Sequence, residues 1–195
     1  SNNLFWRFNM RRLSAEEIRD SILKVNGTLN PKYLGSSFYP EVPREVLQTS
    51  SRPGGVWRKS SPEEQRRRSV YIFIKRSLIP PMLSTHDLAD TDSSCASRFT
   101  TTVPTQALTM LNSKFLNDQA GVFAAYLQKE LGDDARKKIS TALNLVFCRE
   151  PVKAEVDQCV KLINDFQAED KLSAEQAFKY FCLLALNLNE FVYLD

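Results

Sequence analysis

The stretch "SCASRFTTTVPTQALTMLN", residues 94–112, marks the point where the chain changes character. It begins as a polar loop with one Cys and one Arg, passes through three threonines and turns into an apolar helix. Pro104 suits the first helical turn, where the missing backbone N–H has no partner to lose. The helix is expected to break or bend near Asn112. Its start separates a loop-rich first half from a helical second half.

The residues after this point predict a series of helices joined by short connections. The expected helices cover 104–112, about 114–131, 133 or 134 to 147, a segment starting at 151, and 173 to about 188. Their signals are local: Gly132 ends one helix, Asp133 or Asp134 caps the next, and Ser173 with Gln176 forms a capping box. Short connections favour an antiparallel bundle. The expected fold class is therefore mainly α, with a helical bundle in the C-terminal half.

The N-terminal half contains one clear helix and one strand signal. Ser14 and Glu17 form a capping box, and Gly27 suits the end of the helix that follows. In "SVYIFIK", alternating and largely apolar residues indicate a strand buried on both faces. The other β-rich stretch is the C-terminal "EFVYLD", so a small two-stranded element is expected, with 70–75 paired to 190–194.

Residues 28–65 are rich in proline and glycine, which predicts a long loop with one helical turn near "REVLQ". Loops of this length are either functional or disordered. Four aromatic residues favour an ordered loop that is pinned to the body of the domain, although they could also line a groove. They are Tyr33, Phe38, Tyr39 and Trp57.

Composition is typical of a globular protein. The chain has 195 residues, 43% of them hydrophobic and 25% charged, with a net charge of +3. We expect one domain over 13–195, preceded by an inter-domain segment or expression remnant at 1–12. The net charge is too small to indicate nucleic acid, and the basic run 66–68 follows two glutamates, which favours a solvated mixed-charge face. No apolar run reaches the roughly 18 residues of a membrane span.

Few residues offer catalytic or metal chemistry. His86 is the single histidine, and nothing in the spacing supports its pairing with Cys95 as a nucleophile and base. Asp87, Asp90 and Asp92 lie close together, but the glycine of a calcium-binding loop is absent, so turn formation is the favoured role. The cysteine spacings fit neither a CxxC metal pair nor a CxxCH haem site, and mostly free, buried thiols are expected. No catalytic residue and no metal site is predicted.

The polar residues around the opening stretch form the candidate site. We expect an arginine there to bind a nearby carboxylate and threonines to cap the helix, which would lock the loop onto the helix start. Alternatively, the same donors could hold a small polar or anionic ligand at the helix N-terminus. The two roles are compatible. The candidate residues are Asp87, Asp90, Asp92, Cys95, Arg98, Thr101, Thr102, Gln106 and Asn112.

Four stretches carry a family resemblance: "FWRFNMRRLSAEEIRDSILKVNGTLN", "RRSVYIFIKR", "FTTTVPTQALTMLN" and "LALNLNEFVYLD". Together they resemble a C-terminal domain of unknown function found in large exported planctomycetal proteins, which also carry cytochrome c-like domains. The stretches occur in family order and span nearly the whole chain. "TTVPTQALTMLN" and "NEFVYLD" are the most specific of them. The family has no assigned activity, so no catalytic residue can be carried over.

The resemblance implies a setting for the chain. It would be part of a longer exported protein, located in the cell envelope or outside the cell, with its upstream domains as partners. Haem would be expected only on an upstream domain, because this chain has no CxxCH. An oxidising location would also favour a disulfide between Cys148 and Cys159, if their helices pack antiparallel.

Two functions follow from these observations. The first is a non-catalytic interaction or scaffold domain of an exported multidomain protein, which predicts a pinned loop and an exposed apolar patch. The second is a carbohydrate-binding or carbohydrate-active domain, with polysaccharide as partner and a cleft between the aromatic loop 33–57 and the polar loop 86–102. Enzymatic activity is the less favoured interpretation.

Overall fold

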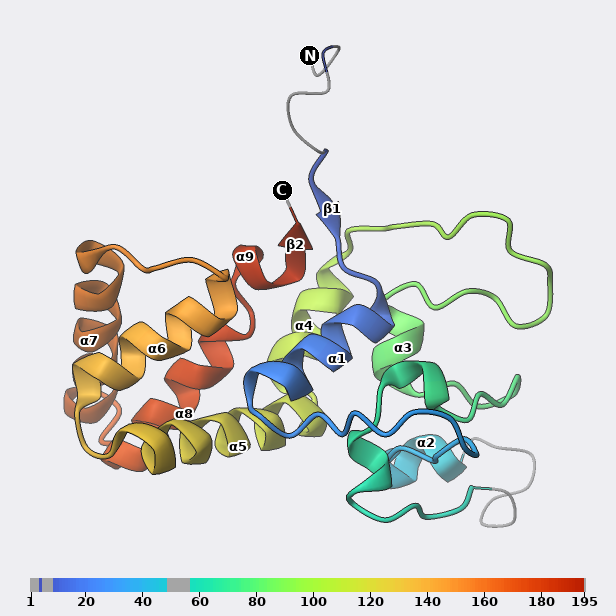
Figure 1. Cartoon of the computed structure of the whole chain (residues 1–195), viewed down its shortest axis with the longest axis horizontal. Helices are drawn as coiled ribbons and strands as arrows, with labels where there is room; N and C mark the ends of the chain where they lie inside the picture. Colours follow the sequence, from blue (N-terminus) through green and yellow to red (C-terminus); the bar gives the residue numbers. More distant parts are fainter. Residues whose placement is uncertain (1–3, 5–8, 49–56, 195) are drawn as a thin grey trace. The chain divides into compact units, whose positions relative to one another are not determined.

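The computed structural model describes residues 4, 9–48 and 57–194. They fall into two compact units. The loop unit comprises residues 14–24 and 28–109, and the helical unit comprises 1–13, 25–27 and 110–195. Figure 1 shows the elements in chain order. The mainly α fold class is confirmed: the helices are α1 (Ala15–Val25), α2 (Arg44–Gln48), α3 (Pro81–Thr85), α4 (Pro104–Asn112), α5 (Lys114–Leu131), α6 (Ala135–Phe147), α7 (Lys153–Ala168), α8 (Ala174–Ala185) and α9 (Asn189–Val192).

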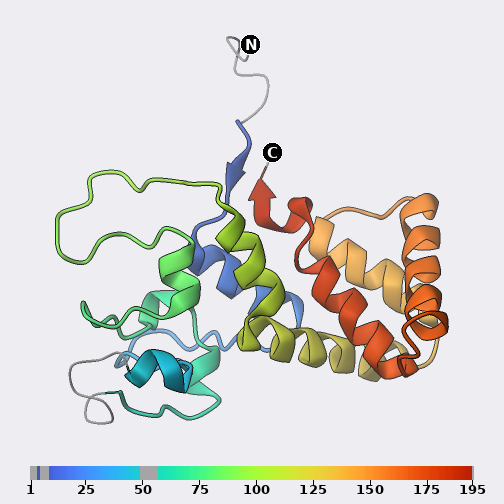
Figure 2. The same cartoon turned by 180° about the vertical axis from the view of Figure 1, so that it is seen from behind.

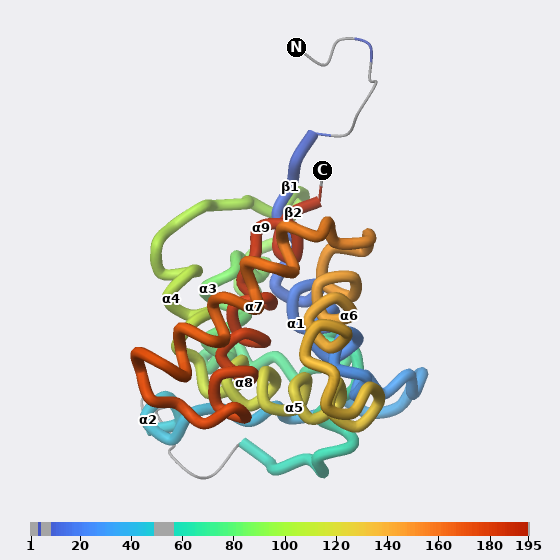
Figure 3. The backbone as a smooth tube through the Cα atoms, turned by 90° about the vertical axis from the view of Figure 1, so that its left-hand side faces the viewer, coloured from blue at the N-terminus to red at the C-terminus, as the bar shows by residue number. Residues whose placement is uncertain are grey.

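The helical unit is a bundle of four helices. Helix α5 packs against α6 and α8, and α7 packs against the same two helices, so the four close around a common core. The arrangement is visible in Figure 3, where α5, α6, α7 and α8 lie around one another. The core is built from side chains with almost no exposed area: Leu116, Phe123, Leu127, Ile139, Leu143 and Phe181. The predicted C-terminal bundle is confirmed.

Side-chain caps begin three helices of the bundle. The Ser113 hydroxyl accepts a hydrogen bond from the backbone of Leu116 at the start of α5. The Asp134 carboxylate accepts one from Lys137 at the start of α6, as the sequence predicts. The capping box at the start of α8 is also present. Helix α8 ends at Ala185, three residues earlier than expected, and the chain continues through a turn into α9.

The two-stranded sheet is present, but the predicted pairing is wrong. Strand β1 (Arg11–Arg12) pairs antiparallel with β2 (Tyr193–Leu194), so Arg11 lies opposite Leu194. A further hydrogen bond from Leu13 N to Val192 O, 2.8 Å long, continues the ladder. The C-terminal stretch is therefore a strand, as expected. Its partner is the segment before α1, whose two arginines carry no strand signal, and residues 70–75 take no part in the sheet.

Residues 69–75 instead form part of the core of the loop unit. A short 3₁₀ helix, η2 (Ser69–Tyr71), leads into an extended segment with a single parallel bridge between Phe38 and Ile72. Phe38 and Ile72 pack with Ala15 and Leu83 in a buried cluster. The apolar pattern that predicted a strand thus reflects burial of an extended segment rather than a sheet.

Hydrogen bonds attach the described parts of the long loop to the 3₁₀ helix η1 (Glu64–Arg66) and to the residues that follow it. Asn30 N donates to Arg66 O, and Phe38 N donates to Tyr71 O. The predicted turn at "REVLQ" is α2. Figure 2 shows α2 and the other elements of Figure 1 from behind. Residues 49–56 of the predicted loop lie outside the described part.

The helix before the loop begins as predicted. Glu17 accepts a hydrogen bond from Ser14 N at 2.7 Å, and Ser14 Oγ accepts one from Glu17 N at 3.3 Å. Gly27 takes a positive φ of 73° shortly after α1 ends, a conformation that favours glycine. Across the described residues, none of the helices combines the length and the apolar character needed to cross a bilayer.

Candidate functional site

Three of the predicted site residues meet in one hydrogen-bonded cluster, which we call the Asp87 lock. It consists of Asp87, Thr101 and Gln106. The Asp87 carboxylate accepts hydrogen bonds from the backbone N of Thr101 at 2.8 Å and from Thr101 Oγ1 at 2.9 Å. Gln106, on the first turn of α4, donates to Thr101 Oγ1 at 3.1 Å. The polar loop is thus attached to the start of α4, as the structural interpretation predicts.

The Asp87 lock also fixes the chain on both sides of the loop. Gln106 Nε2 donates to Thr85 O at the end of α3, and Gln106 Oε1 accepts from Val103 N. Asp87 itself has a positive φ of 61°, which asparagine and aspartate tolerate better than most residues. The buried Gln106 side chain and the Asp87 carboxylate therefore close the base of the loop between them.

The other two aspartates form a local turn. Asp90 accepts hydrogen bonds from Asp92 N and Ser93 Oγ, both at 2.9 Å. These bonds, first the one from Asp92, hold the pKa of Asp90 below its ordinary value. Asp92 forms an ion pair with Arg76. The Asp90 carboxylate therefore stabilises a local turn, as the favoured sequence interpretation expects, whereas the Asp92 carboxylate binds Arg76.

Arg98 does not bind any of the three aspartates, so that part of the predicted lock is wrong. Arg98 Nη1 instead donates to Glu16 Oε2 at 2.8 Å, on the first turn of α1. The hydrogen bond that Arg98 donates to Glu16 is the main reason that the pKa of Arg98 is raised. Spacing along the chain points only to carboxylates that are close in sequence, whereas Glu16 is 82 residues away from Arg98.

The remaining predicted residues lie apart from the Asp87 lock. Cys95 is exposed on the loop, where its thiol donates to Ser97 O at 3.2 Å. Thr102 is exposed between the lock and α4, and Asn112 is exposed at the far end of that helix. His86 is buried, with Nδ1 2.9 Å from Met82 O, which suits a core histidine.

The hydrogen bonds of the Asp87 lock are those of a structural contact within the domain. The Asp87 carboxylate already accepts bonds from a backbone N–H and a hydroxyl, so a ligand would have to displace partners within the domain. In the described part of the chain, no group of three or more His, Cys, Asp or Glu residues is arranged to hold a metal ion.

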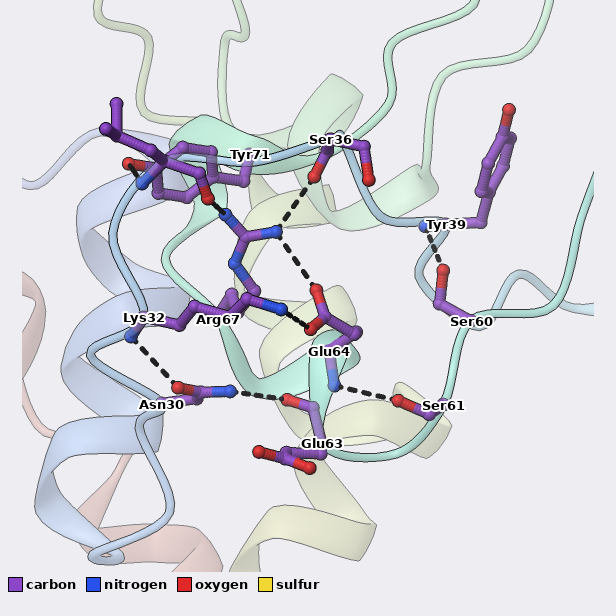
Figure 4. A network of polar contacts seen from close by, with 11 residues as sticks. Asn30, Lys32, Ser36, Tyr39, Ser60, Ser61, Glu63, Glu64, Arg67 and Tyr71 are labelled. Atoms are coloured by element: carbon purple, nitrogen blue, oxygen red, sulfur yellow. Dashed lines mark hydrogen bonds and ion pairs between the residues drawn. The ribbon is translucent and has the colours of Figure 1, made fainter.

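The most deeply buried polar group was missed by the sequence analysis. Arg67 has 0% exposed area and is the largest fully buried side chain among the described residues. Its guanidinium donates to Ser36 O at 2.8 Å, to Leu34 O at 2.5 Å and to Glu64 Oε2 at 3.0 Å. Figure 4 shows these contacts converging on the guanidinium. Arg67 is therefore a structural centre, and the predicted solvated face does not include it.

Tyr71 completes this centre. Its ring lies under the guanidinium, with Arg67 Cζ 4.1 Å from the ring centre. Its hydroxyl accepts a hydrogen bond from Leu34 N at 2.9 Å. Leu34 thus has its N–H and its C=O bound by two neighbouring side chains. Its φ of 61° lies in the left-handed region, which costs a leucine about 1–3 kcal/mol.

A second buried arginine supports the same segment from α1. Arg19 Nη1 donates to Arg67 O at 3.0 Å and to Ser69 Oγ at 3.1 Å, and Nη2 donates to Gln65 O. Burial lowers the pKa of Arg19 to about 10, against the opposing effect of the Asp20 charge. Even so, Arg19 is charged at neutral pH. The Asp20 carboxylate accepts from Ser69 N and Oγ, both at 2.7 Å.

The loop aromatics divide into three environments. Phe38 is in the core, and Tyr33 is exposed. Tyr39 and Trp57 contact each other edge to face, with ring centres 5.5 Å apart, and Tyr39 also lies 4.6 Å from Phe73. Trp57 Nε1 donates to Pro40 O at 2.9 Å, which pins the loop. Tyr39, Trp57 and Phe73 thus form one half-buried aromatic cluster.

All four cysteines lie in the described part of the chain and all are free thiols. The expected bridge between Cys148 and Cys159 is not formed. Free thiols are confirmed, but only Cys182 is fully buried, where burial strongly raises its pKa. Cys148 is exposed at the end of α6, in the left-handed conformation.

Comparison with known proteins places the chain in a family. Its residues 1–163 match the family PSD1, described as a protein of unknown function (DUF1553). None of the curated proteins and none of the solved structures matches the chain. The match covers most of the 195 residues and includes the Asp87 lock and the Arg67 centre. The chain therefore belongs to the PSD1 (DUF1553) family of unknown function.

Proposed function

We propose that the chain is a non-catalytic interaction domain of a longer exported polypeptide, and that it docks on the upstream domains of that polypeptide. The observation that carries this proposal is the Asp87 lock. The carboxylate of Asp87 is engaged by Thr101 N, Thr101 Oγ1 and Gln106. A group held in this way is suited to fixing a loop and poorly placed to bind substrate. The surface is then the part of the domain available for function.

Exposed apolar side chains on the loop unit support this proposal. Tyr33, Leu34, Val70 and Phe99 are large and exposed. Single exposed apolar residues are common on protein surfaces. Here Tyr33 and Leu34 are consecutive and lie on a segment that the Arg67 centre holds in place. A partner that covered them would gain apolar burial without ordering the loop.

The setting is the one that the family resemblance implies. The parent protein would be a planctomycetal, exported and cytochrome c-associated polypeptide, with haem on an upstream domain and no cofactor in this one. Nucleic acid is a poor partner for a chain with a net charge of +3. The partners proposed are the neighbouring domains of the same polypeptide.

Hydroxyl-radical footprinting tests this function. The oxidation rate of each surface side chain is measured in this chain alone and in the full-length parent polypeptide. Docking predicts a contiguous set of side chains that is protected only in the full-length protein. Equal oxidation everywhere would reject the proposal, because a docked domain must cover part of its surface.

A carbohydrate-binding function is the second candidate, and one observation favours it. Tyr39, Trp57 and Phe73 present three half-buried rings close together. Such rings could stack on sugar faces. Calorimetric titration with neutral and acidic oligosaccharides tests this, with Trp57→Ala as the variant. Saturable binding that is lost in Trp57→Ala would favour polysaccharide as the partner, and no heat of binding with any oligosaccharide would remove this candidate.

A further inference from the structure

The segment between Asp87 and Thr101, which the structure describes throughout, contains no helix or strand, and we call it the 88–100 loop. Every residue from 92 to 105 is exposed. Among the hydrogen bonds of the described residues, only one involves the backbone of residues 93–100, and it joins Cys95 Sγ to Ser97 O within the loop. The backbone of residues 93–100 is therefore open to solvent and is not hydrogen-bonded to the rest of the chain.

The two ends of the 88–100 loop are fixed by the Asp87 lock. The Asp87 carboxylate, just before the loop, accepts hydrogen bonds from Thr101 N at 2.8 Å and Thr101 Oγ1 at 2.9 Å, just after it. Gln106 Nε2 adds a bond of 3.1 Å to Thr85 O, which also joins the two sides. The loop is thus closed at its base, so its ends stay together whether or not the loop itself is intact.

Exposed ion pairs join the middle of the 88–100 loop to the rest of the chain. Arg98 Nη1 lies 2.8 Å from Glu16 Oε2 on the first turn of α1, and Asp92 pairs with Arg76. The Arg98 and Glu16 side chains are 46% and 23% exposed. Ion pairs with this exposure contribute little to stability, so the pair between Arg98 and Glu16 opens readily.

The loop has the features of a protease substrate. Exposed loop tips are preferred sites of proteolytic cleavage, whereas a helix must open before a protease can cut it. Arg98 is the single basic residue among residues 88–100. Phe99, which follows it, is 87% exposed. A protease that cuts after basic residues can therefore cleave this loop at one bond.

We propose that the 88–100 loop is a processing site, at which an endoprotease specific for basic residues hydrolyses the peptide bond between Arg98 and Phe99. One water molecule adds across the bond, which leaves a carboxylate on Arg98 and an α-amino group on Phe99. The Arg98 side chain must leave Glu16 to enter the specificity pocket of the protease. The ion pair is therefore a latch that slows cleavage. Processing at this bond does not depend on the docking role proposed above.

The cut chain remains folded, because contacts within each of the two units join the two fragments. In the loop unit, Asp87 of the first fragment binds Thr101 of the second. In the helical unit, β1 of the first fragment pairs with β2 of the second, and Leu13 N donates to Val192 O at 2.8 Å. Cleavage thus changes the connection of the chain without removing either set of contacts.

Limited digestion of this chain with trypsin, followed by mass spectrometry, tests the site. The first pair of internal fragments should be residues 1–98 and 99–195, and the two should elute together on size exclusion without denaturant. Arg98→Gln should abolish this pair at an unchanged thermal midpoint, while chymotrypsin still cuts this variant after Phe99. A first internal cut at another bond would overturn the processing site. Separation of the fragments on size exclusion would overturn the claim that the cut chain remains folded.

Glu16→Gln tests the latch. Because it frees Arg98, trypsin should cut this variant about two to three times faster than wild type, the size of effect expected from an exposed ion pair. Glu175→Gln is the matched control: Glu175 is also exposed, occupies the second position of a capped helix, α8, and forms no ion pair among the described residues. It should leave the cleavage rate unchanged. Equal rates in the two variants would overturn the latch.

Discussion

The guanidinium of Arg67 lies over the ring of Tyr71, with Arg67 Cζ 4.1 Å from the ring centre. Both side chains reach the same residue: Arg67 binds the carbonyl oxygen of Leu34, and Tyr71 binds its N–H. A cation over an aromatic face is attracted by the ring quadrupole, more strongly when water is excluded. This pair therefore links a buried charge of the loop unit to Leu34, an exposed residue with a positive φ.

Replacing Arg67 with methionine should lower the free energy of unfolding by about 2–4 kcal/mol. The carbonyl oxygens of Leu34 and Ser36 would lose a charged donor, and Glu64 would lose one of its cations. Arg68→Met is the control, because the Arg68 side chain is 65% exposed and its change should stay within about 0.5 kcal/mol. Urea unfolding of both variants measures the difference. Equal losses would show that burial of Arg67 is energetically unimportant.

Tyr71→Phe should remove one hydrogen bond while keeping the ring under Arg67. The expected cost is about 1 kcal/mol, the usual net contribution of such a bond. Exchange of the Leu34 amide hydrogen should then accelerate about fivefold, because Leu34 N has lost its acceptor. Exchange within α5 serves as the internal reference. An unchanged rate at Leu34 would mean that the Tyr71 hydroxyl does not hold this amide in solution.

Asp87 and Thr101 should be energetically coupled. In a double-mutant cycle with Asp87→Asn and Thr101→Val, the expected coupling energy is about 1 kcal/mol. Asparagine is chosen because it tolerates the positive φ at this position, so the backbone effect is small. The free energies of unfolding of the four proteins supply the measurement. Additive effects would argue against a structural lock and return the site to the ligand-binding interpretation.

Stability at low pH should depend on Glu64. The hydrogen bond from Lys32, with further contributions from Arg67, lowers the pKa of Glu64 below its ordinary value of 4.5. A carboxyl with a lowered pKa in the fold stabilises the protein above its unfolded pKa, and this contribution is lost as pH falls through the folded pKa. Wild type should therefore lose more stability than Glu64→Gln as the pH falls below 4.5.

The comparison of the two proteins over this range isolates Glu64 from the other carboxyls, which titrate in both. Unfolding by urea at several pH values gives the two curves. Parallel curves would show that the Lys32 and Arg67 contacts do not favour the charged carboxylate. The difference between the two curves should also become smaller in high salt, because salt screens the exposed ion pair between Lys32 and Glu64.

The four thiols should react with a thiol reagent in a fixed order. Cys95 and Cys148 are exposed and should react first. Cys159 should react more slowly, because partial burial raises its pKa and reduces the thiolate fraction. Cys182 should react only after unfolding, because it is buried and burial raises its pKa more strongly than that of Cys159. Mass spectrometry of the labelled peptides reads the order, and protection of Cys148 together with Cys159 would reveal a disulfide in solution.

The elements that could be predicted from the sequence are those with local causes. The boundary of α6 follows from Asp134, the start of α8 from Ser173 and Gln176, and the start of α1 from Ser14 with Glu17. Each cap joins residues three positions apart, so the sequence alone contains the whole interaction. The apolar periodicity between the caps then predicts the bundle.

The features that the sequence did not predict depend on contacts between residues far apart in the chain. Residues 70–75 carry the right residue types for a strand, but Phe38 supplies a single bridge and the sheet partner of Tyr193 is Arg12. Arg67 looks like one member of a solvated basic run, because its partners are carbonyl oxygens, which any residue provides. A backbone acceptor leaves no signal in a single sequence.

In the candidate site, the sequence singled out the polar loop and the three residues of the Asp87 lock. Asp87 and Thr101 are 14 residues apart and were expected to contribute to one lock. The carboxylate partner of Arg98 was wrong, because Glu16 lies on a helix that starts before the long loop. Contacts across such distances depend on tertiary packing, which composition and spacing do not encode.

The pairing of β1 with β2 has a mechanical consequence. Arg11 lies opposite Leu194, so the two strands leave the sheet in the same direction at their outer ends (Figure 1). A force pulling these two ends apart would load the hydrogen bonds one at a time, starting at Arg11 and moving inward to the bond between Leu13 and Val192. The strands would unzip under low tension, well before any helix of the bundle had to unfold.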